Sequence, residues 1–173
     1  MVKFYFYYFP DVNRGIVSIK YIIMARTKVK NIIHIIFHVK WTGARMQKED
    51  LKRIFSYISG IIKGVGGFPI RVGGTIDHVH ILTTLPKTIA LSDFVRTIKA
   101  ESSKWVKTLE KRYKRFAWQD GYGAFSVSQS MVNKTISYIE NQDLHHTKQT
   151  FEDEYKAFLD AYAIDYDDCY LFN

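Results

Sequence analysis

The sequence has little cysteine and proline and no long apolar run. Its 173 residues include one cysteine, Cys169, and three prolines. A single thiol excludes an intramolecular disulfide and a metal site made of several cysteines, and it suits a reducing compartment. No apolar run approaches the ~18 residues of a membrane span. The aromatic-rich segment 4–9 lacks the small-residue cleavage site of a secretory signal. We therefore expect a soluble, cytoplasmic protein with no membrane partner.

Acidic residues are also in deficit. Lys and Arg number 25 against 17 Asp and Glu, which gives a net charge of +8. This excess favours a polyanionic partner such as nucleic acid over an acidic small substrate. An apolar content of 47% is ample for the core of one compact domain. We expect residues 24–173 to form that domain, preceded by an extension of unassigned role at residues 1–23.

Hydrophobic periodicity predicts the order strand, helix, strand, strand, helix, strand, followed by more helices. The predicted strands are 31–41, 68–76, 77–85 and 122–128, and the predicted helices are 47–63, 92–113, 130–142 and 151–162. This order is typical of a ferredoxin-like or RRM-like α+β fold, an antiparallel sheet with two helices on one face. The other face would be open for a site, and a C-terminal helix would carry Tyr138.

Two histidines alternate on one predicted strand, in Asp77-His78-Val79-His80-Ile81-Leu82. Side chains two apart on a strand point the same way, about 6.6 Å from each other, so both imidazoles can reach one cation. Val79 between them would face the core. A His-x-His pair alone is more often structural, and it gains weight only from its context.

That context is a tyrosine and an amide one helical turn apart. Tyr138 and Gln142 share one face of a predicted helix. A phenol is a poor nucleophile at neutral pH, but it can attack a phosphodiester when a cation polarises the phosphate. Two imidazoles and an amide oxygen leave coordination positions open, which suits Mg²⁺ or Mn²⁺. Attack by tyrosine would conserve the bond energy, so no nucleotide cofactor is needed for rejoining.

These segments together resemble a known family. Residues 77–82 look like the HUH motif, and residues 118–128 with Tyr138-Ile139-Glu140-Asn141-Gln142 resemble the single-tyrosine HUH transposases of small insertion sequences and their repeat-associated relatives. The resemblance extends over roughly residues 28 to 160. It implies that Tyr138 forms a 5′-phosphotyrosine bond and that His78, His80 and Gln142 bind the metal. It also implies a prokaryotic, DNA-associated protein, a substrate of single-stranded DNA with hairpin ends, and a homodimer.

The predicted helix 92–113 carries basic side chains that could track phosphates, namely Arg96, Lys99, Lys104 and Lys107. A solvated helix face is the other interpretation of this pattern. Ile-rich surroundings place His34 and His38 in the core or at a dimer interface, and His145-His146 read as part of a polar turn.

A different class of function stays open. The same sheet could belong to a non-catalytic RRM-like module that binds single-stranded nucleic acid, since such modules stack bases on aromatic side chains. Tyr138 and His80 would have no purpose in that module. Histidine-triad hydrolases are disfavoured because the third alternating position holds Leu82.

Overall fold

The computed structural model describes residues 28–142 and 150–171. These residues form a four-stranded antiparallel sheet in the order β2-β3-β1-β4. The strands are β1 (Asn31–His38), β2 (Phe68–Gly74), β3 (His78–Leu85) and β4 (Gly123–Ser126). The helices are α1 (Lys48–Gly64), α2 (Leu91–Leu109), α3 (Val132–Glu140), α5 (Phe151–Ala161) and α6 (Asp168–Leu171), with short 3₁₀ helices at Lys111–Arg115 and Gln129–Met131.

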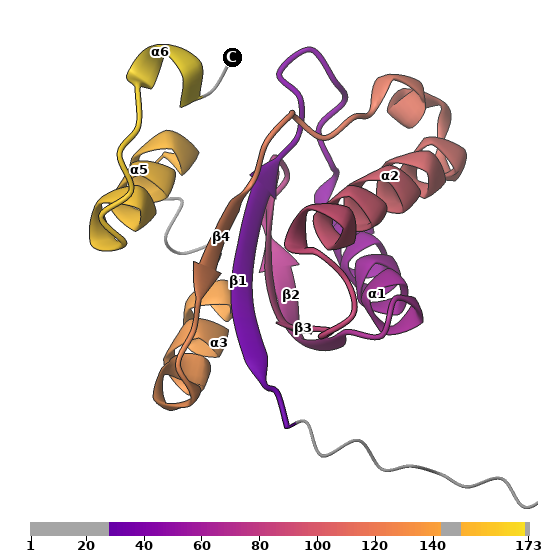
Figure 1. Ribbon diagram of the computed structural model, residues 1–173. Coiled ribbons are helices and arrows are strands. Elements are labelled where there is room, and N and C mark those ends of the chain that lie inside the picture. The colour runs from indigo at the N-terminus through magenta and orange to yellow at the C-terminus, as the bar shows by residue number, and fades with distance from the viewer. Residues whose placement is uncertain (1–27, 143–149, 172–173) are drawn as a thin grey trace, which may run out of the picture.

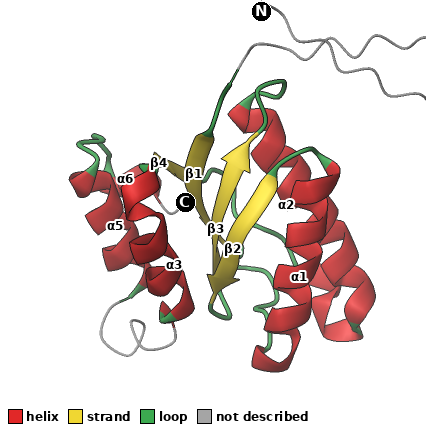
Figure 2. Cartoon of the chain, turned by 90° about the horizontal axis from the view of Figure 1, so that it is seen from below, coloured by secondary structure: helices red, strands yellow, loops and turns green. Residues whose placement is uncertain are grey.

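Helices lie on both sides of the sheet. Helices α1 and α2 lie on one side, while α3, α5 and α6 lie on the other (Figures 1 and 2). The strand order and the first two helices confirm the predicted ferredoxin-like α+β fold. The second face, which we expected to be open, is covered by α3 and α5. A candidate site on that face is therefore buried between the sheet and helices that follow it in the chain.

Strands β1 and β3 form the centre of the sheet, and alternation along them separates core from site. Ile35, Phe37, Val79 and Ile81 are buried in the main core, which also holds the apolar sides of α1 and α2. The intervening positions of both strands point to the other face, and they include four of the chain's histidines, His34, His38, His78 and His80. In the antiparallel register, His38 lies opposite His78.

The two helices on the core side follow the predicted pattern. Ile54, Ile58 and Ile62 of α1 are completely buried, as the helical spacing of apolar residues requires. Helix α2 is shorter than predicted, because it ends at Leu109 and the chain continues as a 3₁₀ helix that contains Tyr113. The buried Tyr113 donates a hydrogen bond to Asp50 near the start of α1, so this 3₁₀ turn holds the ends of both helices together.

Two glycines allow the second helical layer to approach the sheet. A Cβ atom on Gly73 of β2 would lie 2.7 Å from Cγ2 of Ile139 on α3. A Cβ atom on Gly123 of β4 would likewise lie 2.7 Å from Cε2 of Tyr155 on α5. Larger residues at either position would push these helices outward. The small residues therefore determine how closely α3 and α5 cover the histidine face.

Within residues 28–142 and 150–171, no helix has both the length and the apolar character needed to cross a membrane. The extension at residues 1–23 and the pair His145-His146 lie outside the described residues, so the predictions for them stay untested.

Candidate metal and nucleophile site

His78 opens β3 and is completely buried. Its Nδ1 lies 2.8 Å from Oδ1 of Asp77 and 3.0 Å from Oγ1 of Thr75. These contacts turn Nε2 inward, to 3.2 Å from Oε1 of Gln142. Burial would raise the pKa of Asp77, but hydrogen bonds with His78 and Thr75 hold it well below its ordinary value. An anionic carboxylate on the outer nitrogen is the usual second partner of a metal-binding histidine.

His80 is the next side chain on the same face of β3, and its ring centroid lies 5.0 Å from that of His78. Its Nδ1 lies 3.0 Å from Nε2 of the buried His34 on β1. Burial, and then the charge of His80, lower the pKa of His34 well below its ordinary value. A neutral His34 can accept a hydrogen bond from Nδ1–H of His80, which leaves the Nε2 lone pair of His80 directed into the site.

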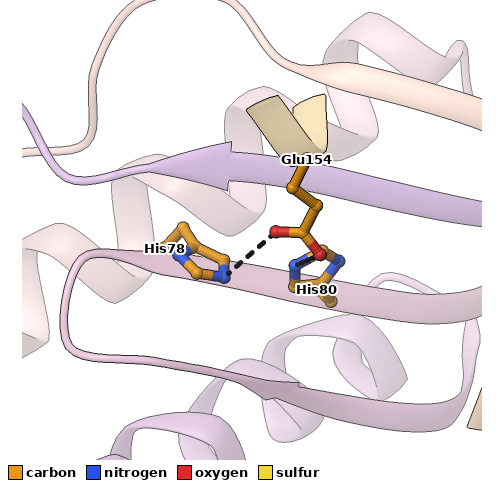
Figure 3. Close-up of side chains that lie close together, drawn as sticks. All are labelled: His78, His80 and Glu154. Carbon is orange, nitrogen blue, oxygen red and sulfur yellow. Dashed lines mark ion pairs between the residues drawn. The ribbon is translucent and has the colours of Figure 1, made fainter. Parts of the chain in front are cut away.

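Glu154 reaches the two histidines from the other side of the site (Figure 3). It lies in the first turn of α5, which Thr150 caps by accepting a hydrogen bond from the backbone N–H of Asp153. The Glu154 carboxylate lies 3.5 Å from Nε2 of His80 and 3.8 Å from Nε2 of His78. Burial would raise its pKa, but the proximity of His80 and the hydrogen bonds from Tyr138 and Gln142 lower it well below its ordinary value. Glu154 is therefore a buried anion.

Tyr138 and Gln142 complete the site from α3 and the residues just after it. The Tyr138 ring centroid lies 5.8 Å from that of His80, and its hydroxyl donates a hydrogen bond to Oε1 of Glu154. Gln142 donates to the same carboxylate oxygen at 2.9 Å. Burial and the hydrogen bond to Glu154 raise the pKa of Tyr138 above its ordinary value, so the phenol keeps its proton in this arrangement.

The donor set fits a divalent cation. One ligand atom from each of His78, His80 and Glu154 can be chosen so that all three lie within 4.8 Å of one another. With its proton on Nδ1, His80 presents a lone pair to the Glu154 carboxylate, and two facing acceptors are stable only with a proton or a cation between them. Two imidazoles and a carboxylate are suitable ligands for Mn²⁺ and related metals, and Gln142 offers a further oxygen.

The site contains all four side chains that the sequence predicted and two that it did not. His78, His80, Tyr138 and Gln142 converge within a single chain. Glu154 was missed, although it stands three residues after Phe151 and four before Phe158, within the apolar side of its helix. A charged residue in that position is a signal of burial. His34 was placed in the core but not in contact with His80.

The four basic residues predicted to bind nucleic acid lie on α2, on the side of the sheet away from the site (Figure 1). Lys104 and Lys107 are exposed. Arg96 pairs with Asp93 at 2.8 Å. Lys99 donates hydrogen bonds to the backbone carbonyls of Gln119 and Gly121, both at 2.6 Å, and so has a structural partner. Contact of this helix with nucleic acid stays a prediction.

Comparisons with known proteins agree with this fold. Residues 27–142 match the sequence model of the family described as transposase IS200 like. The crystal structure of a candidate transposase from Deinococcus radiodurans R1 is 20% identical, with a TM-score of 0.53 over 68% of this chain and 94% of that chain. A REP-associated tyrosine transposase bound to a REP hairpin is 15% identical, with a TM-score of 0.53 over 70% of this chain and 72% of that chain. No curated protein matches significantly.

Proposed function

Because the chain belongs to the IS200-like transposase family, we propose that it cleaves and rejoins single-stranded DNA through a covalent bond to Tyr138. The observation that carries the proposal is the convergence of this tyrosine with His78, His80 and Glu154 in one buried cluster. A core tyrosine with a structural role would not need two imidazoles and a carboxylate around its hydroxyl. Each of these groups has a part in phosphoryl transfer.

Tyr138 is the nucleophile in this proposal. Its oxygen attacks the phosphorus of a DNA phosphodiester, a tyrosine-phosphate bond forms, and the bond to the 3′ oxygen breaks. The 3′ oxygen takes up a proton from water and leaves as a hydroxyl, and the protein stays attached to the 5′ phosphate. Glu154 already accepts the hydrogen bond of the phenol, which makes it the nearest acceptor for the proton. Because a phosphodiester replaces a phosphodiester, the reverse attack rejoins the strand without a nucleotide cofactor.

His78, His80 and Glu154 would hold Mg²⁺ or Mn²⁺, with the amide oxygen of Gln142 as a further ligand. When bound, this cation would polarise the phosphate and offset the negative charge of Glu154. Asp77 orients His78 through Nδ1, and His34 orients His80 in the same way. The hydrogen bond that raises the pKa of Tyr138 also holds its hydroxyl beside the ligands, so the nucleophile is in place before the strand arrives.

The proposed partners are supported by the family match and by a neighbour of similar fold. A related protein of similar fold has been described bound to a REP hairpin, and we propose that this chain also recognises hairpin ends of single-stranded DNA. The homodimer stays part of the proposal. Within the described residues, His78, His80, Glu154, Tyr138 and Gln142 all come from one chain, so the proposal does not depend on a partner to bring these side chains together. The exposed α2 lysines, on the opposite side, are candidates for holding more distant phosphates.

The test is a covalent adduct on a denaturing gel. The wild-type protein with Mn²⁺ and a labelled single-stranded hairpin oligonucleotide should give a protein-DNA band, and Tyr138→Phe should give none while binding the oligonucleotide nearly as well. His78→Ala and His80→Ala should also abolish the band. An adduct that persists in Tyr138→Phe would exclude this tyrosine as the nucleophile. Binding without any adduct in the wild type would favour the non-catalytic RRM-like alternative.

A further inference from the structure

Trp41 is unusually exposed for a tryptophan. It lies in the loop after β1 and is 55% exposed, whereas Trp118 is 6% exposed. Tryptophan is among the more deeply buried residue types on average. An exposed indole ring offers an aromatic surface on which another planar ring can stack.

Trp41 is connected to the metal site by a row of rings. Its centroid lies 5.8 Å from that of His38, which lies 5.1 Å from Phe151 of α5. Phe151 lies in turn 4.9 Å from the ring of His78. Two rings therefore lie between the exposed indole and His78, a candidate metal ligand. His38 lies opposite His78 in the sheet, so a group that rests on Trp41 would lie at the same end of the sheet as this ligand.

The space next to Trp41 has a matching charge. A small pocket is lined by His38, Val39, Lys40, Trp41, Arg45, Asp77 and Phe151. The carboxylate of Asp77 is held by His78 and Thr75 and also interacts with the charge of Arg45. Lys40 and Arg45 together outnumber this one acidic group, so the lining favours an anionic group. The pocket volume is about 20 Å³, which is too small for a nucleobase but sufficient for a phosphate oxygen.

We propose that Trp41 is the stacking platform for a nucleobase next to the scissile phosphate, and that Arg45 and Lys40 bind the phosphate of the same nucleotide. This inference rests on the proposed function, since the ligand is the DNA strand that the site would cleave. Stacking on an aromatic side chain is tolerant of base identity. The subsite therefore positions the strand and does not read its sequence.

The experiment measures binding without cleavage. The full chain in EDTA is titrated with labelled oligothymidylate of about 20 nucleotides, longer than most single-stranded sites, and with an abasic strand of equal length. Trp41→Ala should weaken binding to oligothymidylate about tenfold and leave binding to the abasic strand unchanged. Arg45→Gln should weaken binding to both strands and reduce the salt dependence by about one phosphate contact.

Phe68→Ala is the matched control. Phe68 is an aromatic residue with an exposed fraction of 65%, paired with Thr84 at the opposite end of β3 from His78. The Phe68→Ala variant should bind both strands as tightly as the wild type does. The inference is overturned if Trp41→Ala equals Phe68→Ala on oligothymidylate, or if it loses equally on both strands. Either result leaves the adduct assay for Tyr138 unaffected, so failure of the subsite is separable from failure of the proposed function.

Discussion

The Nε2 atom of His34 lies 3.0 Å from Nδ1 of His80, so a third buried histidine orients a candidate metal ligand. A partner on the outer nitrogen fixes both the ring and its tautomer, and losing such a partner typically costs about 10- to 100-fold in metal affinity. We expect His34→Ala to weaken Mn²⁺ binding within that range in isothermal titration calorimetry. His34→Gln, whose amide oxygen can accept from Nδ1–H, should recover part of the affinity.

The control for His34 is Ser102→Ala. Ser102 is a buried hydroxyl on α2 that accepts a hydrogen bond from the indole of Trp118 on the other side of the sheet. The Ser102→Ala substitution should lower the melting temperature without changing the affinity for Mn²⁺. If His34→Ala and Ser102→Ala bind Mn²⁺ equally well, His34 only fills space in the core.

Glu154 and Gln142 make different contributions to the same cluster, and their variants should separate them. Glu154 brings a negative charge to the two imidazoles, whereas Gln142 brings a neutral oxygen 3.2 Å from Nε2 of His78. We expect Glu154→Ala to reduce Mn²⁺ affinity by about a hundredfold or more and Gln142→Ala by about tenfold, measured by calorimetry. A larger loss in Gln142→Ala would make the amide the principal third ligand and leave Glu154 as the hydrogen-bond partner of Tyr138.

The sequence predicted the fold and four of the six residues that meet in the candidate site, because the signals of these four are local. The alternation of His78 and His80 follows from the geometry of one strand. Tyr138 and Gln142 were predicted on one helix, and they still meet although α3 ends at Glu140 and Gln142 lies just beyond it. The positions of Glu154 and His34 in the site depend on how two separate elements pack against each other. The contact of His34 with His80 requires the register of β1 against β3, and that of Glu154 requires the path between α3 and α5. Neither contact can be predicted from the spacing of residues within one segment.

The close approach of α3 to the sheet should be measurable as stability. In Gly73→Ala the new Cβ would lie 2.7 Å from Cγ2 of Ile139, and overpacking of this kind costs about 1–3 kcal/mol. The double variant Gly73→Ala/Ile139→Ala should lose less free energy of unfolding than the two single variants lose together, because removing Cγ2 of Ile139 makes room for the new Cβ. Urea unfolding gives all three values.

Gly60→Ala provides the comparison for Gly73→Ala. A Cβ on Gly60, within α1, would meet no atom within 4 Å, so the change should stabilise the protein by about 0.5–1 kcal/mol through helix propensity. Equal effects of the two glycine variants would mean that α3 moves aside freely and that Gly73 does not set its position.

The protonated Tyr113 hydroxyl should contribute to the free energy of unfolding at neutral pH, and this contribution should be lost at high pH. Its hydroxyl donates to Oδ2 of Asp50 at 2.6 Å and accepts from the backbone N–H of Gln47 at 3.0 Å. Burial, followed by the hydrogen bond to Asp50, raises the pKa of Tyr113 to about 12. The unfolded phenol titrates near 10, so its protonated form stabilises the fold fully below about pH 10, and this stabilisation is lost as the pH rises toward 12.

Tyr113→Phe removes that term and should therefore lower the free energy of unfolding by about 1–3 kcal/mol at neutral pH. The difference from the wild type should narrow as urea unfolding is repeated at increasing pH above about 10. Tyr57→Phe is the matched control, because this tyrosine stacks on Trp105 with centroids 4.1 Å apart. A wild-type advantage over Tyr113→Phe that stays constant through this pH range would contradict the assignment, since it would mean that the folded and unfolded phenols titrate alike.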